Sequence, residues 1–275
     1  MRYLEVGSGQ PLVLLHAFPL SADQWLPQLA RGATGNRMIA PDLRGFRGTG
    51  PAFEDGALEG ISMDDYAADV LALMTHLDID RAIVVGASMG GYVAFAMLRR
   101  APTRVAGLVL ANTRAIPDSA DGRAGRDRLI AAVRRDGPDA VVREMLPKLL
   151  GVTTQREQPD LVEAVERLMR LNGRDALVAG LSAMRDRPDC RPLLAGITCP
   201  TTVIAGAEDA IIPPAEPEAM HASIPSSRLV RLAAVGHLAN LEAAAEFSKI
   251  LAPVPTALRR SGAFGGPAGN QSSVS

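Results

Sequence analysis

The sequence has few cysteines, few aromatic residues and almost no net charge. Its two cysteines, Cys190 and Cys199, lie in different surroundings, which favours two reduced thiols and a cytoplasmic protein. The first six residues carry a charge at Glu5 and no apolar run, so no secretory signal is expected. A formal net charge of −1 offers no general attraction to nucleic acid or to an anionic membrane, and neither is expected as a partner.

A long uninterrupted hydrophobic run is also absent. The longest uncharged stretch, residues 82–98, is slightly short for a membrane span and contains Gly-Ala-Ser-Met-Gly-Gly at its centre. A buried strand followed by a buried helix explains this stretch better. With 275 residues, 47% of them hydrophobic, the chain is long enough to bury a large core in one domain.

Short buried strands alternate with helical patterns along most of the chain. This alternation predicts an α/β fold with a mostly parallel, doubly wound sheet and helices on both faces. An amphipathic crossover helix begins near Ser62, and a final helix contains Leu241, Phe247 and Leu251. The predicted strands are residues 11–16, 37–40, 82–86, 105–111, 202–206 and 228–232.

One long segment, residues 114–197, interrupts the alternation because it shows helical patterns and no convincing strand. We interpret it as a helical lid inserted into a single domain that spans residues 1–252. Methionines on its inner faces, such as Met145, are candidates for an adaptable apolar pocket, although most buried methionines are simply core. Residues 253–275 lack any apolar period and are expected to form a flexible tail.

The hexapeptide at residues 86–91 places Ser88 between a predicted strand and a predicted helix. Glycines at 86 and 90 allow the close approach of strand and helix that a strained nucleophile elbow requires. A serine hydroxyl is a poor nucleophile at neutral pH, so Ser88 needs a neutral imidazole as base and a carboxylate that orients the imidazole. The sequence therefore predicts a catalytic serine whose partners follow it along the chain.

The partners are expected in loops at the carboxyl ends of later strands, where such sheets hold their sites. His237 follows the last predicted strand, whereas His76 and His221 are more simply surface residues. Asp209 follows the strand that ends at Gly206, with Glu208 and Asp42 as weaker rivals for the acid.

Two backbone amides are predicted to stabilise the negative charge that develops on the attacked carbonyl. Met89 follows the nucleophile at a helix start, and Phe18 lies in the loop His16-Ala17-Phe18-Pro19, where Pro19 has no N–H. His16 is an alternative base but more simply shapes this loop. Trp25 is a further pocket candidate, with packing against Leu29 as the alternative.

Five motifs in order make the chain similar to the α/β-hydrolase superfamily, in the branch that contains esterases, lactonases and cofactor-free haloperoxidases. Residues 16–19 resemble the family's His-Gly-Phe-Pro loop, and residues 42–48 resemble its Asp-Leu-Arg-Gly-His-Gly turn. Residues 86–91, 206–209 and 236–237 resemble its elbow, acid loop and histidine loop. The chain departs from the pattern at Ala17 and at Phe46-Arg47.

The resemblance implies a serine hydrolase that cleaves a small-molecule carboxylic ester or lactone through an acyl-enzyme, with no cofactor and no metal. Dehalogenases and epoxide hydrolases of this fold carry aspartate at the elbow, so Ser88 argues against both activities. Enol-lactones and acyl-homoserine lactones remain possible substrates. The alternatives are a perhydrolase or haloperoxidase that uses the same triad, and a ligand receptor of low turnover.

Overall fold

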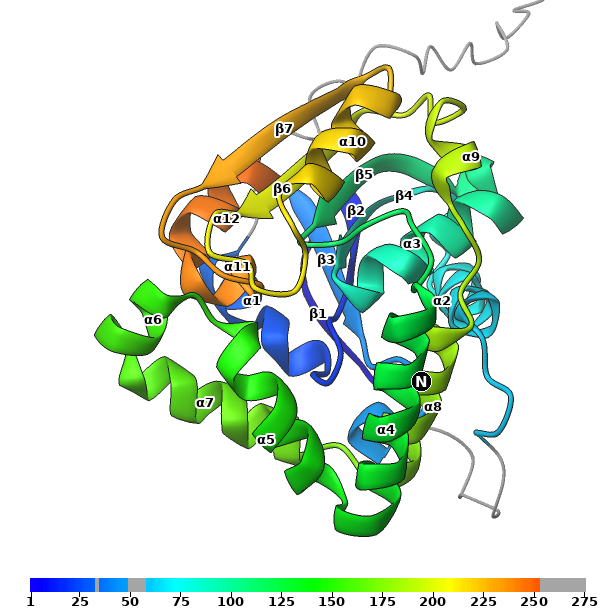
Figure 1. Cartoon of the computed structure of the whole chain (residues 1–275). Coiled ribbons are helices and arrows are strands. Elements are labelled where there is room, and N and C mark those ends of the chain that lie inside the picture. Colours follow the sequence, from blue (N-terminus) through cyan, green and yellow to red (C-terminus); the bar gives the residue numbers. More distant parts are fainter. Residues whose placement is uncertain (33–34, 49–57, 253–275) are drawn as a thin grey trace, which may run out of the picture.

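The computed structural model describes residues 1–32, 35–48 and 58–252 of the chain. Seven strands form one sheet in the order β1-β3-β2-β4-β5-β6-β7, and every pairing is parallel except that of β1 with β3 (Figure 1). The strands are β1 (Tyr3–Gly7), β2 (Gln10–Leu15), β3 (Asn36–Pro41), β4 (Ala82–Ala87), β5 (Val105–Ala111), β6 (Thr201–Gly206) and β7 (Ser227–Leu232). This sheet confirms the predicted fold class.

Strand β1 is the one strand that the sequence did not predict. It pairs antiparallel with β3 at the edge of the sheet and stays partly exposed. Its Glu5 carboxylate accepts a hydrogen bond from Arg37 on β3 at 2.6 Å. A charged residue in the middle of a short segment obscures the apolar pattern, whereas the pairing with β3 that stabilises β1 is not visible in the local sequence.

Helices cover both faces of the sheet, with α2 and α3 packed together on one face and α1 and α12 together on the other. Helix α2 begins at the predicted Ser62, whose hydroxyl accepts from the amide of Asp65 in a capping box. Outside the segment between β5 and β6, the helices are η1 (Ala22–Trp25), α1 (Leu26–Arg31), η2 (Phe46–Gly48), α2 (Met63–His76), α3 (Met89–Arg100), η3 (Pro102–Arg104), α10 (Ala215–Ser223), α11 (Ala239–Glu242) and α12 (Ala244–Leu251).

Six helices lie between β5 and β6, and we call them the helical insertion. Figure 1 shows most of them in green along one side of the molecule, away from β7. They are α4 (Ala120–Asp136), α5 (Pro138–Leu149), α6 (Val152–Glu157), α7 (Pro159–Arg170), α8 (Arg174–Arg185) and α9 (Arg191–Leu194). Helical patterns in the sequence around residues 129–133, 141–150, 161–171 and 176–184 correspond to α4, α5, α7 and α8. The short helices α6 and α9 have no such counterpart, and the predicted final helix is divided into α11 and α12.

Three further expectations concern the carboxyl-terminal segment, the membrane and the cysteines. The predicted tail, residues 253–275, lies outside the described residues. Within the described part of the chain, no helix is both long enough and apolar enough to cross a bilayer. Both cysteines are free thiols.

Candidate active site

Ser88 lies at the sharp turn between β4 and α3. Its backbone adopts φ 50° and ψ −111°, a conformation that is strained for a residue with a side chain. The Ser88 amide donates to the carbonyl of Ala111 at 2.9 Å, and the Thr113 hydroxyl donates to the Ser88 carbonyl at 2.8 Å. These bonds to the end of β5 hold the strained turn in place.

Two glycines allow the chain to make this turn. A Cβ on Gly86 would lie 2.5 Å from the carbonyl oxygen of Gly90, and a Cβ on Gly90 would lie 2.2 Å from the carbonyl oxygen of Leu15. Both distances are far below van der Waals contact. The steric reason that the sequence suggested for these glycines is therefore present in the structure.

The three residues predicted as a triad are brought together from β4, β6 and β7. His237 Nε2 lies 2.8 Å from Ser88 Oγ, and His237 Nδ1 lies 2.8 Å from Asp209 Oδ2. Ser88 is 8% exposed and His237 2% exposed, so the hydrogen-bonded chain is almost completely shielded from water. This geometry matches a nucleophile, a base and the carboxylate that orients the base.

Asp209 accepts hydrogen bonds from three donors besides His237. Its Oδ1 accepts from the amides of Ile211 at 2.8 Å and Ile212 at 3.0 Å, and its Oδ2 accepts from Asn112 Nδ2 at 2.9 Å. Burial raises the pKa of Asp209, but His237 and these donors outweigh burial, and the pKa lies below its ordinary value. The carboxylate is therefore ionised and directed at the imidazole.

The two rival acids have other partners. Glu208 accepts from the amide and hydroxyl of Thr153 in α6, at 2.8 and 2.6 Å. Asp42 is completely buried and accepts from Arg2 and from the amide of Ala22. Glu208 therefore connects the acid loop to the helical insertion, and Asp42 fixes the amino-terminal region.

His16 has the surroundings of a structural histidine. Its Nδ1 donates to the carbonyl of Ala17 at 3.1 Å, and its Nε2 accepts from the amide of Leu43 at 3.1 Å. Burial lowers the pKa of His16 to about 4, so the ring is neutral at neutral pH. The ring of Phe46 packs edge-on against the His16 ring, with 4.9 Å between the ring centroids. Phe46, at which the chain departs from the family pattern, therefore packs against the loop that contains His16.

The two predicted amide donors come from segments that lie close together. Met89 is the first residue of α3, and the amides of a first helical turn have no acceptor within their helix. Phe18 lies in the loop after β2, which ends at Leu15. The carbonyl of Leu15 lies against Gly90 in the first turn of α3. The role of both amides as oxyanion donors remains a prediction.

The two pocket candidates lie in different places. Met145 on α5 lines a cleft of about 710 Å³ between the helices of the insertion. Trp25 is completely buried, and its ring lies 5.9 Å from that of Phe247 on α12. Burial and the contact with Phe247 are those of a core residue. Packing against Leu29 and a role in a pocket both remain predictions.

Sequence reasoning missed two residues that support the triad. Asn112, directly after β5, donates to Asp209 and also to the carbonyl of Gly236 at 3.1 Å. Glu242 in α11 accepts from the amides of Gly236 at 2.9 Å and Leu238 at 3.0 Å, on both sides of His237. The position of Asn112 at the carboxyl end of a predicted strand was a usable signal, whereas nothing local distinguishes Glu242 from a helix-surface acid.

The described residues contain no group of three or more His, Cys, Asp or Glu side chains arranged to hold a metal ion. His237 and Asp209 instead hydrogen-bond each other, and their remaining atoms are occupied by Ser88, Asn112 and backbone amides. Ser88, His237 and Asp209 thus form one continuous hydrogen-bonded chain.

Comparisons with known proteins agree with this fold. The chain is 36% identical to a thermophilic esterase from Thermogutta terrifontis, with a TM-score of 0.85 over 91% of this chain and 90% of that one. It is 26% identical to the enol-lactonase from Burkholderia xenovorans, with a TM-score of 0.80 over 91% and 94% of the two chains.

Among curated proteins, the chain is 32% identical to the dihydrolipoyllysine-residue acetyltransferase component of the acetoin cleaving system of Pseudomonas putida, over 90% of its own length. It spans 65% of the length of that relative. The model of the family described as "alpha/beta hydrolase fold" matches residues 10–244. The chain belongs to the α/β-hydrolase fold family.

Proposed function

We propose that this protein is a serine hydrolase that cleaves a carboxylic ester or a lactone through an acyl-enzyme. The observation that carries the proposal is the continuous hydrogen-bonded chain from Ser88 through His237 to Asp209, with 2.8 Å at each step. His237 accepts the Ser88 proton while Oγ attacks the carbonyl carbon, and Asp209 stabilises the imidazolium that forms. His237 then protonates the leaving alkoxide.

Water completes the cycle. His237 removes a proton from a water molecule that attacks the acyl-enzyme, and the acid product leaves with Ser88 restored. The amides of Phe18 and Met89 stabilise the tetrahedral oxyanion both when the acyl-enzyme forms and when water hydrolyses it. Each donor is typically worth about 3 to 4 kcal/mol. For a lactone, the leaving alcohol is the far end of the acyl group itself, so it stays attached throughout and water releases a single hydroxy acid.

The relatives support a carbonyl substrate of this kind. The chain is similar to proteins described as an esterase and an enol-lactonase, and it is 27% identical, with a TM-score of 0.73, to an enzyme described as degrading N-acyl homoserine lactones. These three descriptions share the attack on an ester carbonyl.

The test is the turnover of p-nitrophenyl acetate by the unmodified protein and by Ser88→Ala, together with labelling by a fluorophosphonate. We expect labelling and turnover in the unmodified protein, and neither in a cooperatively folded Ser88→Ala variant. Turnover that persists in the variant would contradict the mechanism. Labelling without turnover would instead favour the alternative of a ligand receptor.

A perhydrolase is the second candidate, because the chain is 43% identical over 104 residues to a non-heme chloroperoxidase from Streptomyces lividans. In this reaction hydrogen peroxide replaces water in the second half, and the products are a peracid and free Ser88. The peracid oxidises bromide to hypobromite and is itself reduced to the carboxylic acid. Bromination in acetate with peroxide, measured against ester hydrolysis, distinguishes the two reactions.

A further inference from the structure

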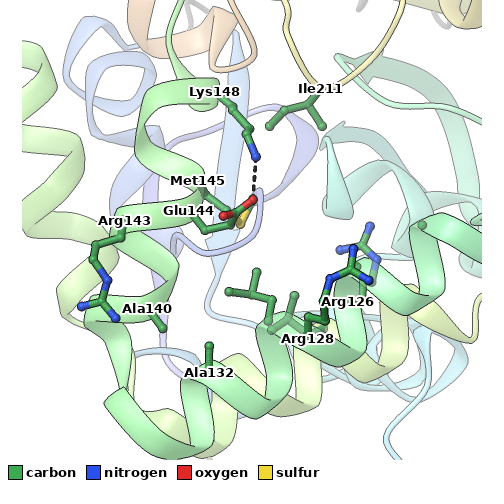
Figure 2. Close-up of a pocket in the computed structure, with 13 residues that line it drawn as sticks. Arg126, Arg128, Ala132, Ala140, Arg143, Glu144, Met145, Lys148 and Ile211 are labelled. Atoms are coloured by element: carbon green, nitrogen blue, oxygen red, sulfur yellow. Dashed lines mark hydrogen bonds and ion pairs between the residues drawn. The ribbon is translucent and has the colours of Figure 1, made fainter.

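The helical insertion contains a cleft between α4 and α5 (Figure 2), with a volume of about 710 Å³. We call it the insertion cleft. Leu129, Met145 and Leu181 give it apolar walls, and charged side chains surround them. The charged residues that line it are Arg126, Arg128, Arg143, Glu144 and Lys148.

The insertion cleft extends to the loop that carries the triad acid. Ile211, two residues after Asp209, lines the cleft, and its amide donates to Asp209 Oδ1 at 2.8 Å. Figure 2 shows Ile211 in the same half of the view as Arg126 and Arg128, with Arg143 in the other half. A molecule in the cleft therefore contacts the insertion and the acid loop together.

The charge of the lining is mostly positive, and not all of it is neutralised. Lys148 pairs with Glu144 at 2.6 Å, and Arg143 pairs with Asp136 at 2.7 Å. Arg128 has no hydrogen bond or ion pair with any residue in the described part of the chain. Its guanidinium group is thus free to bind an anion at the wall formed by α4.

A cationic cluster lies behind the same wall. The buried carboxylate of Asp118 pairs with Arg126, with Arg114 at 2.9 Å and with Arg187 at 2.8 Å. Three guanidinium groups thus share one carboxylate. The Nε atoms of Arg114 and Arg187 are buried and have no hydrogen-bond partner among the described residues, and the Arg187 guanidinium lies over the Tyr92 ring, 4.2 Å from its centroid. The three guanidinium groups carry more positive charge than the one Asp118 carboxylate neutralises, and this net charge raises the electrostatic potential at the Arg126 end of the cleft.

We propose that the insertion cleft binds a carboxylate group of the substrate. The preferred ester or lactone then carries one free carboxylate in addition to its ester group. The apolar walls accommodate the carbon chain between the two groups, and Arg128 and Arg126 receive the carboxylate. Guanidinium groups suit this role because their planar N–H donors match the two oxygens of a carboxylate. The inference rests on the proposed function and specifies its substrate class.

The experiment compares two substrates of matched chain length, monoethyl adipate and ethyl hexanoate, by titration of the released acid. The unmodified protein is expected to show a higher kcat/KM for the half-ester. Arg128→Gln is expected to reduce the ratio of the two kcat/KM values by about fivefold, the upper range for an exposed ion pair. The control is Arg134→Gln, an exposed arginine on α4 that does not line the cleft, which is expected to leave both values unchanged.

A binding measurement separates this inference from the proposed function. Calorimetric titration of the Ser88→Ala protein with monoethyl adipate is expected to show binding that Arg128→Gln weakens by a similar factor. Hydrolysis of ethyl hexanoate without preference for the half-ester, or an equal ratio in the Arg128→Gln protein, would overturn the carboxylate site and leave the serine mechanism intact. Binding of the half-ester with no hydrolysis of either ester would refute the proposed function alone.

Discussion

The carboxylate of Glu242 accepts a hydrogen bond from the amide of Gly236 at 2.9 Å, directly before His237. The same side chain accepts from the amide of Leu238 on the other side of His237 and from the amide of Gly151 in the insertion, at 3.0 and 2.8 Å. One buried carboxylate thus connects the histidine loop to the helical insertion. Glu242 is therefore a positioning residue for His237, although it does not touch Ser88.

Glu242→Gln replaces one acceptor oxygen by an NH₂ group that faces backbone donors. We expect kcat for ester hydrolysis to fall by about tenfold to a hundredfold, because small displacements of a catalytic group are costly. The rate of Ser88 labelling by a fluorophosphonate should fall in parallel. Glu246→Gln, at an exposed position of α12, is the control and should change neither rate. An unchanged labelling rate in a folded Glu242→Gln protein would contradict the positioning role.

Asp209 and Glu208 are adjacent carboxylates with different partners, so they provide a matched pair. Asp209→Asn should lower kcat by about 10⁴-fold, since an amide stabilises the wrong tautomer of His237. Glu208→Gln alters the hydrogen bonds with Thr153 in α6 and should change kcat by less than about tenfold. The measurement is kcat for p-nitrophenyl acetate at pH 8. Similar losses in the two variants would argue against the assignment of the acid.

The sequence predicts the parts of this molecule whose signals are local. Buried β-branched runs predict six strands, and the glycines beside Ser88 predict the elbow. The antiparallel pairing of β1, by contrast, depends on contacts with β3 that are distant in sequence. Asn112 likewise bonds to Gly236, which is more than 100 residues away; its place after a predicted strand is a local signal, but its partner is not. Glu242 lies only six residues from Gly236, but its local sequence does not distinguish it from an acid on a helix surface.

His16 should make the stability of the protein sensitive to mild acid. Its pKa is about 4 in the folded protein, below the value near 6.5 expected for the unfolded chain. The unfolded state therefore binds the proton first, and stability falls as the pH decreases from 6.5 toward 4. Between pH 7.5 and pH 5 this one group accounts for about 2 kcal/mol of lost stability.

Urea unfolding of the unmodified protein and of His16→Gln at the two pH values tests this dependence. The unmodified protein should lose about 2 kcal/mol more stability than the variant between pH 7.5 and pH 5. His76→Gln, at an exposed position of α2, should retain the pH dependence of the unmodified protein. Equal losses in the unmodified and His16→Gln proteins would show that His16 is not buried as a neutral ring.

Gly90 allows α3 and β2 to approach each other closely, and the proposed oxyanion amides of Met89 and Phe18 lie next to these two elements. A Cβ at this position would lie 2.2 Å from the carbonyl oxygen of Leu15, at the end of β2. Gly90→Ala must therefore move α3 and β2 apart. Because this clash involves two backbones, we expect a loss of at least about 2 kcal/mol in the free energy of unfolding. The displaced amides of Met89 and Phe18 should also lower kcat in the protein that remains folded.

Gly173→Ala is the matched control for this substitution. Gly173 precedes α8 with φ −72°, and a Cβ there meets no atom within 4 Å. The same chemical change should then cost only about 0.5 to 1 kcal/mol, the difference between glycine and alanine at an N-cap. Urea unfolding and kcat for p-nitrophenyl acetate measure both effects. Gly90→Ala with the stability and kcat of Gly173→Ala would contradict the close approach of β2 and α3, and with it the proposed position of the Phe18 amide.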